Sequence, residues 1–130
     1  MNPSDSPPAP RPTPSGLVYH LCPAQRWVDQ RAGAAYEPEG FAAEGFVHAT
    51  VGLDATLVPA NRYYADDPRP HVCLTIDLSR VGVEVRFDAD PHIYPHIYGP
   101  VPTAAVTEVR DASRASDGTF TGFGPPLATH

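Results

Sequence analysis

The chain has 130 residues, which is enough for one domain and too few for two. Nine arginine and lysine residues stand against fifteen aspartate and glutamate residues, so the formal net charge is −6 with neutral histidines. Phosphate neutralisation needs clustered cations, and the arginines here are scattered, so this balance argues against a nucleic-acid partner. The chain shows no signal-peptide pattern and no membrane-length apolar run, which predicts a cytoplasmic protein without a membrane partner.

Composition also divides the chain. Six prolines in the first fifteen residues indicate a disordered arm over 1–15, followed by one globular domain over 16–125 and a loose tail over 126–130. Cys22 and Cys73 lie far apart without a CxxC pattern, which excludes a zinc ribbon and a thioredoxin-like motif. The oligomeric state stays open at this level.

Alternating apolar and polar residues predict several short strands, and two segments show helical spacing. The expected strands are 16–22, 45–50, 71–78, 83–88, 105–110 and 118–123. A helix over 24–33 has Trp27 as its core anchor, and 34–45 is expected to be a loop. A second helix over 53–64 is kinked or restarted at Pro59, and Val58 is placed on its apolar face. Several strands with two short helices predict an α+β fold.

Histidine is frequent, with six in the chain, and four histidines lie in distinctive local patterns. His20 is in the middle of a strand, His48 lies in GFVHAT, and His92 and His96 belong to a tandem PHIY repeat. In an extended segment the last two would be about 13 Å apart, too far for one ion, so no metal site is predicted. No GxSxG elbow or papain-like signature is present, so both cysteines are expected to be ordinary buried thiols.

Five segments carry a resemblance to a known family. They are VYHLCPAQRW, AAYEPEGFAAEGFVHAT, LTIDLSRVGVEVRFD, PHIYGPVPTAAV and DGTF. In this order they resemble the bacterial domain-of-unknown-function 952 family over most of residues 17–120. The resemblance implies a fold similar to the ADP-ribosyltransferase superfamily, with two small, mostly antiparallel β-sheets facing a cleft that binds NAD.

The resemblance also implies a set of site residues. His20 would contact the ribose, His48 and Thr50 would line the next strand, and His96 with Tyr98 would close the far wall. The family usually carries a glutamate before its HIYGP block, and Asp88 takes that place here. The duplicated PHIY leaves open which copy is functional, and we favour the second because GPVP follows it. The implied catalytic residues are His20, His48, Asp88, His96 and Tyr98, and the implied NAD-binding residues are His20, Thr50, Tyr98 and Gly99.

The function implied by the resemblance is cleavage of the nicotinamide–ribose bond of NAD, with transfer of ADP-ribose to an unknown acceptor or to water. NAD is then a substrate, and no metal is required. One alternative is a non-catalytic module on the same scaffold that binds a nucleotide or a protein. A second is an RNA 2′-phosphate-processing transferase, which needs clustered arginines around the phosphate that are not evident in the sequence.

Structural interpretations of the same residues stay open beside the functional ones. His20 can also be explained as a hydrogen-bonded core histidine, and His48 as a structural strand residue. Tyr94 and Tyr98 suit aromatic packing. The segment 83–88 alternates charged residues in the manner of a solvated strand face with an ion pair.

Overall fold

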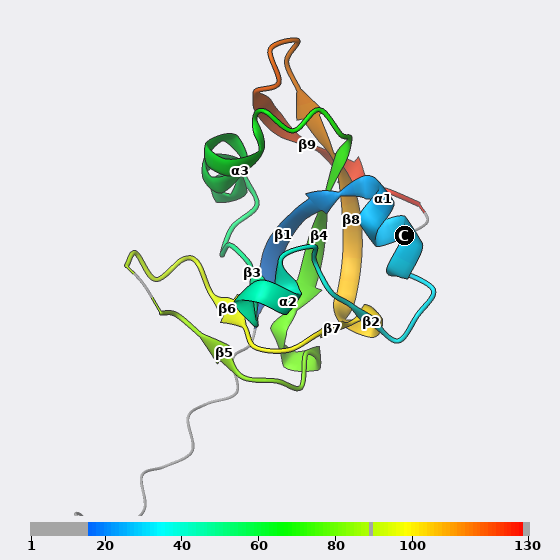
Figure 1. Ribbon diagram of the computed structural model, residues 1–130, viewed down its shortest axis with the longest axis vertical. Coiled ribbons are helices and arrows are strands. Elements are labelled where there is room, and N and C mark those ends of the chain that lie inside the picture. Colours follow the sequence, from blue (N-terminus) through cyan, green and yellow to red (C-terminus); the bar gives the residue numbers. More distant parts are fainter. Residues whose placement is uncertain (1–15, 89, 129–130) are drawn as a thin grey trace, which may run out of the picture.

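The segment with the clearest alternation in the sequence forms the centre of the main sheet. The computed structural model describes residues 16–88 and 90–128, so the predicted arm over 1–15 lies outside the described residues. Strand β4 (His71–Asp77) pairs antiparallel with β1 (Leu17–Pro23) and with β8 (Val106–Arg114), and β8 pairs with β9 (Phe120–Pro126). The order β1-β4-β8-β9 leaves β1 at one edge of this sheet (Figure 1).

The described residues also form two small antiparallel sheets. The first pairs β2 (Ala35–Tyr36) with β7 (Val101–Pro102). The second has the order β3-β6-β5, from β3 (Val47–His48), β6 (His96–Ile97) and β5 (Val85–Arg86). The expectation of two sheets is therefore wrong in number, because three sheets are present in residues 16–88 and 90–128. Each strand of these two small sheets has only two residues.

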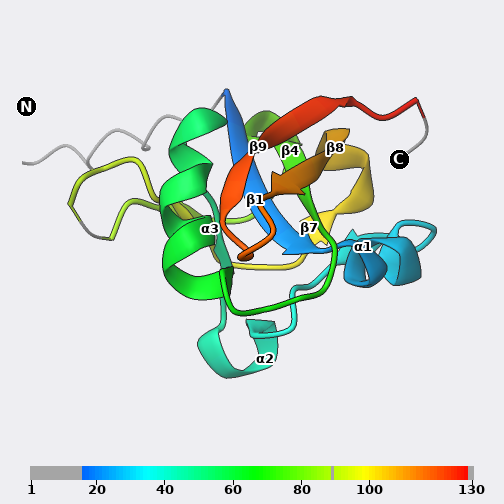
Figure 2. The same ribbon diagram turned by 90° about the horizontal axis from the view of Figure 1, so that it is seen from above.

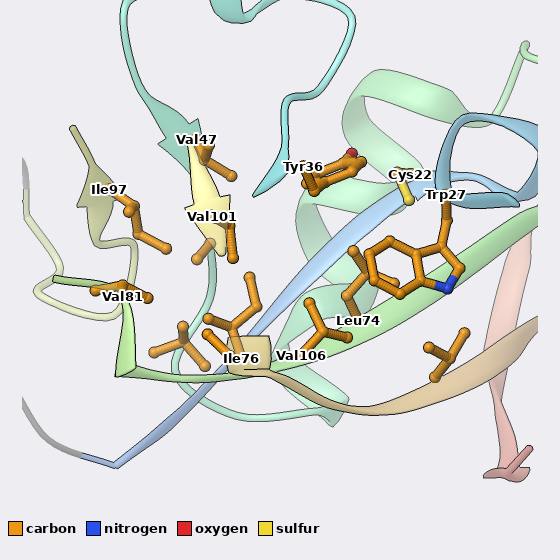
Figure 3. Packing of buried hydrophobic residues seen from close by; sticks show 14 of the residues in the cluster. Cys22, Trp27, Tyr36, Val47, Leu74, Ile76, Val81, Ile97, Val101 and Val106 are labelled. Atoms are coloured by element: carbon orange, nitrogen blue, oxygen red, sulfur yellow. The ribbon is translucent and has the colours of Figure 1, made fainter. Parts of the chain in front are cut away.

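The main core lies between one face of the main sheet and the two small sheets. Strand alternation directs Val18, Leu74 and Ile76 to this face. Helix α1 (Ala24–Gln30) adds Trp27, which is buried as predicted. Figure 3 shows Tyr36, Val47, Ile97 and Val101 of the small sheets packing above these residues.

Helix α3 (Leu57–Tyr64) covers the opposite face of the main sheet. A 3₁₀ turn (Asp54–Thr56) leads into it, and Pro59 lies in its first turn, where a missing N–H is tolerated. Figure 2 shows α3 and α1 on either side of the main-sheet strands. The expected apolar face was wrong for Val58, whose exposed fraction is 61%, because Ala60 instead turns toward the sheet.

Some element boundaries also differ from those expected. Helix α2 (Phe41–Glu44) is a third helix, of one turn, in the segment expected to be a loop. Strand β9 continues to Pro126, and the N–H of Leu127 donates to the carbonyl of Val109 at 2.8 Å, so the domain extends past residue 125. None of the described helices is long and apolar enough to cross a membrane.

Gly99 connects β6 to β7 at a point of close approach. It is buried, and a Cβ at this position would lie 2.7 Å from Cγ1 of Val83. Val83 packs against the main core, so it has little room to move away. Gly99, assigned to NAD binding by resemblance, therefore has a packing role in the structure.

We expect Gly99→Ala to lower the free energy of unfolding by about 1–3 kcal/mol, because the added methyl group overpacks the contact with Val83. Gly122→Ala is the matched control, since nothing lies within 4 Å of a Cβ at that position. Chemical denaturation of both variants measures the difference. A Gly99→Ala protein as stable as the Gly122→Ala protein would contradict this packing role.

Candidate functional site

A cleft of about 920 Å³ opens beside β1, the edge strand of the main sheet. Its lining comes from β1, from α3, from β3 and β6, and from the segments 36–44 and 90–94. Four of the residues expected to form the site line it together. These are His20, His48, Thr50 and His96. Asp88, Tyr98 and Gly99 are not among the residues that line it.

His20 forms part of the cleft floor, with an exposed fraction of only 6%. Its Nδ1 lies 2.6 Å from the main-chain oxygen of His48, and its Nε2 lies 2.8 Å from the hydroxyl of Tyr36. A carbonyl oxygen can only accept, so Nδ1 carries the proton and Nε2 accepts from Tyr36. Burial lowers the pKa of His20 to about 4, although the bond to His48 opposes this shift. The imidazole is therefore neutral at pH 7.

Both ring nitrogens of His20 are thus occupied within the protein. A ribose hydroxyl could bond to either nitrogen only if one of these two bonds were broken. The structure accordingly fits the core-histidine interpretation of His20, while also placing the residue in the wall of the cleft. Its direct contact with a ribose stays a prediction.

Tyr36 is a site residue that the sequence did not reveal. It is fully buried in β2, and its ring meets those of His20 and Trp27 edge to face, with centroids 5.4 and 5.9 Å away. Burial raises the pKa of its hydroxyl, which stays protonated and donates to His20. Burial also raises the pKa of the neighbouring Cys22 thiol to about 12, which makes it unsuited to nucleophilic chemistry.

His48 forms a carboxylate–imidazole pair with Glu44. The Nε2 of His48 lies 2.5 Å from Oε2 of Glu44. Helix α2 ends at Glu44, and Gly45 takes the left-handed conformation, with φ of 81°, that returns the chain toward β3. This turn places the carboxylate over the imidazole four residues later. Glu44, which lies in the segment expected to be a loop, is a carboxylate on the cleft wall.

His96 forms a second such pair with Asp88, behind the cleft wall. Oδ2 of Asp88 accepts from Nδ1 of His96 at 3.0 Å and also accepts from the hydroxyl of Tyr98. The bond from Tyr98, followed by that from His96, lowers the pKa of Asp88 and keeps it ionised. The structure therefore places Asp88 and Tyr98 against His96 and outside the cleft lining.

The two histidines of these pairs stand directly opposite each other. His48 and His96 are register partners between β3 and β6, and their ring centroids lie 5.3 Å apart. Phe46 stacks on His96 at 4.1 Å and meets His48 edge to face at 4.8 Å. Phe46 was also missed at the sequence level, and it fixes the orientation of both imidazoles.

The opposite wall of the cleft is aromatic and partly apolar. Val58, Arg62, Tyr63 and Tyr64 of α3 line it. Val58 and both tyrosines are exposed, and the guanidinium of Arg62 lies 5.5 Å from the ring centroid of Tyr63. Exposed aromatic rings grouped on a concave surface are typical of a binding site for a flat ligand.

The other two histidines within the described residues, His71 and His92, do not extend the site. His92 pairs with Asp90 at 3.0 Å on the surface, and the side chain of His71 is buried, with Nδ1 donating to the carbonyl of Arg69. Within residues 16–88 and 90–128, no group of three histidine, cysteine, aspartate or glutamate side chains is arranged to hold a metal ion.

Residues 21–109 match the family described as "Protein of unknown function (DUF952)". The chain belongs to this family. No curated protein matches the sequence.

Two solved structures of one relative share the fold of this DUF952 protein. The crystal structure of CC0527 from Caulobacter crescentus has a TM-score of 0.69 and 20% identity, covering 82% of this chain and 94% of that one. Its solution NMR structure has a TM-score of 0.62 and 22% identity, covering 78% and 89%. At this identity the likeness establishes the α+β fold alone.

We expect Tyr36→Phe to lower the free energy of unfolding by about 1–3 kcal/mol, because Nε2 of His20 would be left buried without a donor. Tyr63→Phe is the matched control, since its ring is exposed and its change should stay within about 0.5 kcal/mol. Urea denaturation followed by tryptophan fluorescence measures both. Equal stability of the two variants would show that the bond from Tyr36 to His20 contributes nothing.

Proposed function

We propose that this protein consumes NAD by cleaving the bond between nicotinamide and ribose, and passes ADP-ribose to water or to another acceptor. The likeness of the chain to ADP-ribosyltransferase folds, implied by the resemblance of its sequence, supports the proposal. The observation that carries it is that β1, an edge strand of the main sheet, lines the cleft.

The main chain of Tyr19 shows which way this edge faces. Its N–H donates to Thr50 at 2.9 Å and its carbonyl accepts from Thr50 at 2.8 Å, so both groups point away from β4. In an antiparallel ladder the direction alternates with each residue, so Leu21 also turns its N–H and carbonyl outward. Leu21 lines the cleft. One donor and one acceptor on the same residue can pair with the carboxamide of nicotinamide, whose carbonyl accepts and whose NH2 group donates.

The charge of the cleft wall suits the bond that breaks. Nicotinamide leaves NAD as a neutral ring, and positive charge moves to the ribose as an oxocarbenium ion develops. A preorganised carboxylate stabilises such charge in the transition state. Glu44, held against His48 on the cleft wall, meets this need better than Asp88, which contacts His96 and Tyr98 instead.

The α3 wall suits the rest of the dinucleotide. Tyr63 and Tyr64 offer ring faces for the adenine, and Arg62 offers a cation for the diphosphate. Arg62 is the one arginine or lysine among the described residues that line the cleft. A single cation is a weak basis for RNA 2′-phosphate processing, so that alternative ranks below NAD cleavage.

One observation favours a non-catalytic module as the second candidate. Both nitrogens of His20 are occupied, so the floor of the cleft is already satisfied without a ligand. A module of this kind would bind the nucleotide through the β1 edge and the α3 wall and would leave it intact.

The test is incubation of the protein with NAD, with nicotinamide release measured by chromatography and binding measured by thermal shift. We expect release by the wild type, and a fall of about 10²-fold or more in Glu44→Gln with binding retained. Glu37→Gln is the matched control, because Glu37 is exposed and does not line the cleft. A thermal shift without release would favour the binding module, and neither signal over a long incubation would refute the proposal.

A further inference from the structure

We infer that His96 is the general base for the acceptor and that the acceptor is a neutral hydroxyl compound, water in the simplest case. This inference rests on the proposed cleavage of NAD. Departure of nicotinamide requires no proton transfer, but a water molecule that attacks C1′ of the ribose must lose one. A base is therefore needed on the cleft wall only at the acceptor step.

The hydrogen bond to Asp88 occupies Nδ1 of His96 and leaves Nε2 to act as the general base. A carboxylate can only accept, so Nδ1 carries the proton that bonds to Asp88 at 3.0 Å. In the neutral ring Nε2 then has a free lone pair, and among the described residues it has no hydrogen-bond partner. His96 lines the cleft, so an acceptor bound there can reach this residue. Asp88 acts as a positioning residue, because it hydrogen-bonds to His96 and Tyr98 and is not among the described residues that line the cleft.

The ring of His96 is also held more firmly than the rings of His48 and His92. Phe46 stacks on it with an interplanar angle of 17°, and the exposed fraction of the side chain is 19%. His48 is 57% exposed, and its Nε2 is already engaged by Glu44. His92 has the same kind of partner in Asp90, yet it is 68% exposed and does not line the cleft. His96 alone among these three combines a fixed orientation, partial burial and a free nitrogen at the cleft.

The negative charge near His48 and His96 favours a neutral acceptor over an anionic one. The carboxylates of Asp88 and Glu44 lie next to His96 and His48, while the guanidinium of Arg86 pairs with Glu84 at 2.7 Å. An anionic acceptor would be repelled from this wall. A neutral hydroxyl is not repelled, and it is the kind of acceptor that needs a base.

The step balances without a further reactant. The C1′–N bond breaks, and its electron pair stays on the pyridine nitrogen, which leaves as neutral nicotinamide. The oxygen of water forms the new bond to C1′, and its proton passes to Nε2 of His96. Asp88 stabilises the resulting imidazolium, which then releases the proton to solvent. The products are nicotinamide, ADP-ribose and one proton.

The experiment measures nicotinamide release by His96→Ala with and without free imidazole, next to His92→Ala as the matched control. We expect His96→Ala to lose about 10²-fold or more in turnover, and added imidazole to restore part of it, because a free base can enter the space left by the ring. His92→Ala should keep the wild-type rate. Asp88→Asn should lower kcat with little change in KM, and methanol added to the wild type should yield the methyl glycoside of ADP-ribose.

The outcomes separate this inference from the proposed function. If the wild type releases nicotinamide and folded His96→Ala keeps its rate, the inference fails and NAD cleavage stands. Imidazole that restores His48→Ala but leaves His96→Ala inactive would also overturn it, by assigning the base to His48. If the wild type does not release nicotinamide, both the proposed NAD cleavage and the role of His96 are refuted.

Discussion

The described part of the fold depends on one buried imidazole that belongs to the main sheet and hydrogen-bonds to both small sheets. His20 belongs to β1 of the main sheet, its Nδ1 donates to the His48 carbonyl of β3, and its Nε2 accepts from the Tyr36 hydroxyl of β2. The strands of the small sheets have two residues each, so their ladders alone provide few hydrogen bonds. A buried donor or acceptor without a partner costs about 1–3 kcal/mol, so both bonds of His20 constrain where the small sheets can lie.

This constraint extends from the core to the cleft. The carbonyl that His20 holds is that of His48, so the same bond sets the position of β3. Register then places His96 opposite His48, while Gly45 brings Glu44 back onto the same imidazole. The structural and functional interpretations of His20 are therefore compatible. A core histidine therefore positions the part of the cleft wall that carries His48 and His96.

The parts of the fold that followed from the sequence are those with a long, regular pattern. Strands β1 and β4 alternate over seven residues each, and Trp27 is the one large aromatic side chain of the α1 segment, so these elements lie where the pattern put them. Both faces of β4 are covered, so His71 to Ile76 are all buried, and the alternation in the sequence marks Val72, Leu74 and Ile76 as the side chains that face the main core.

The parts that did not follow are short or depend on contacts distant in sequence. Tyr36 and Phe46 lie in or next to strands of two residues, where no period can be measured. The direction of the Asp88 side chain beside a two-residue strand is set by tertiary contacts with His96 and Tyr98, which no sequence pattern shows. The catalytic role of Asp88 implied by the resemblance stays a prediction. Val58 was placed on the wrong face because Leu57 and Ala60, three residues apart on α3, pack toward the sheet instead.

The protonation state of His20 tests the central claim most directly. Two-bond ¹⁵N–¹H correlation spectra of the ¹⁵N-labelled protein report which ring nitrogen carries the proton. The account predicts a proton on Nδ1 and none on Nε2, with no change from pH 8 to pH 5, because burial lowers the pKa of His20 to about 4. A proton on Nε2, or titration of this ring near the ordinary histidine value of about 6.5, would contradict the claim that one neutral imidazole joins the three sheets.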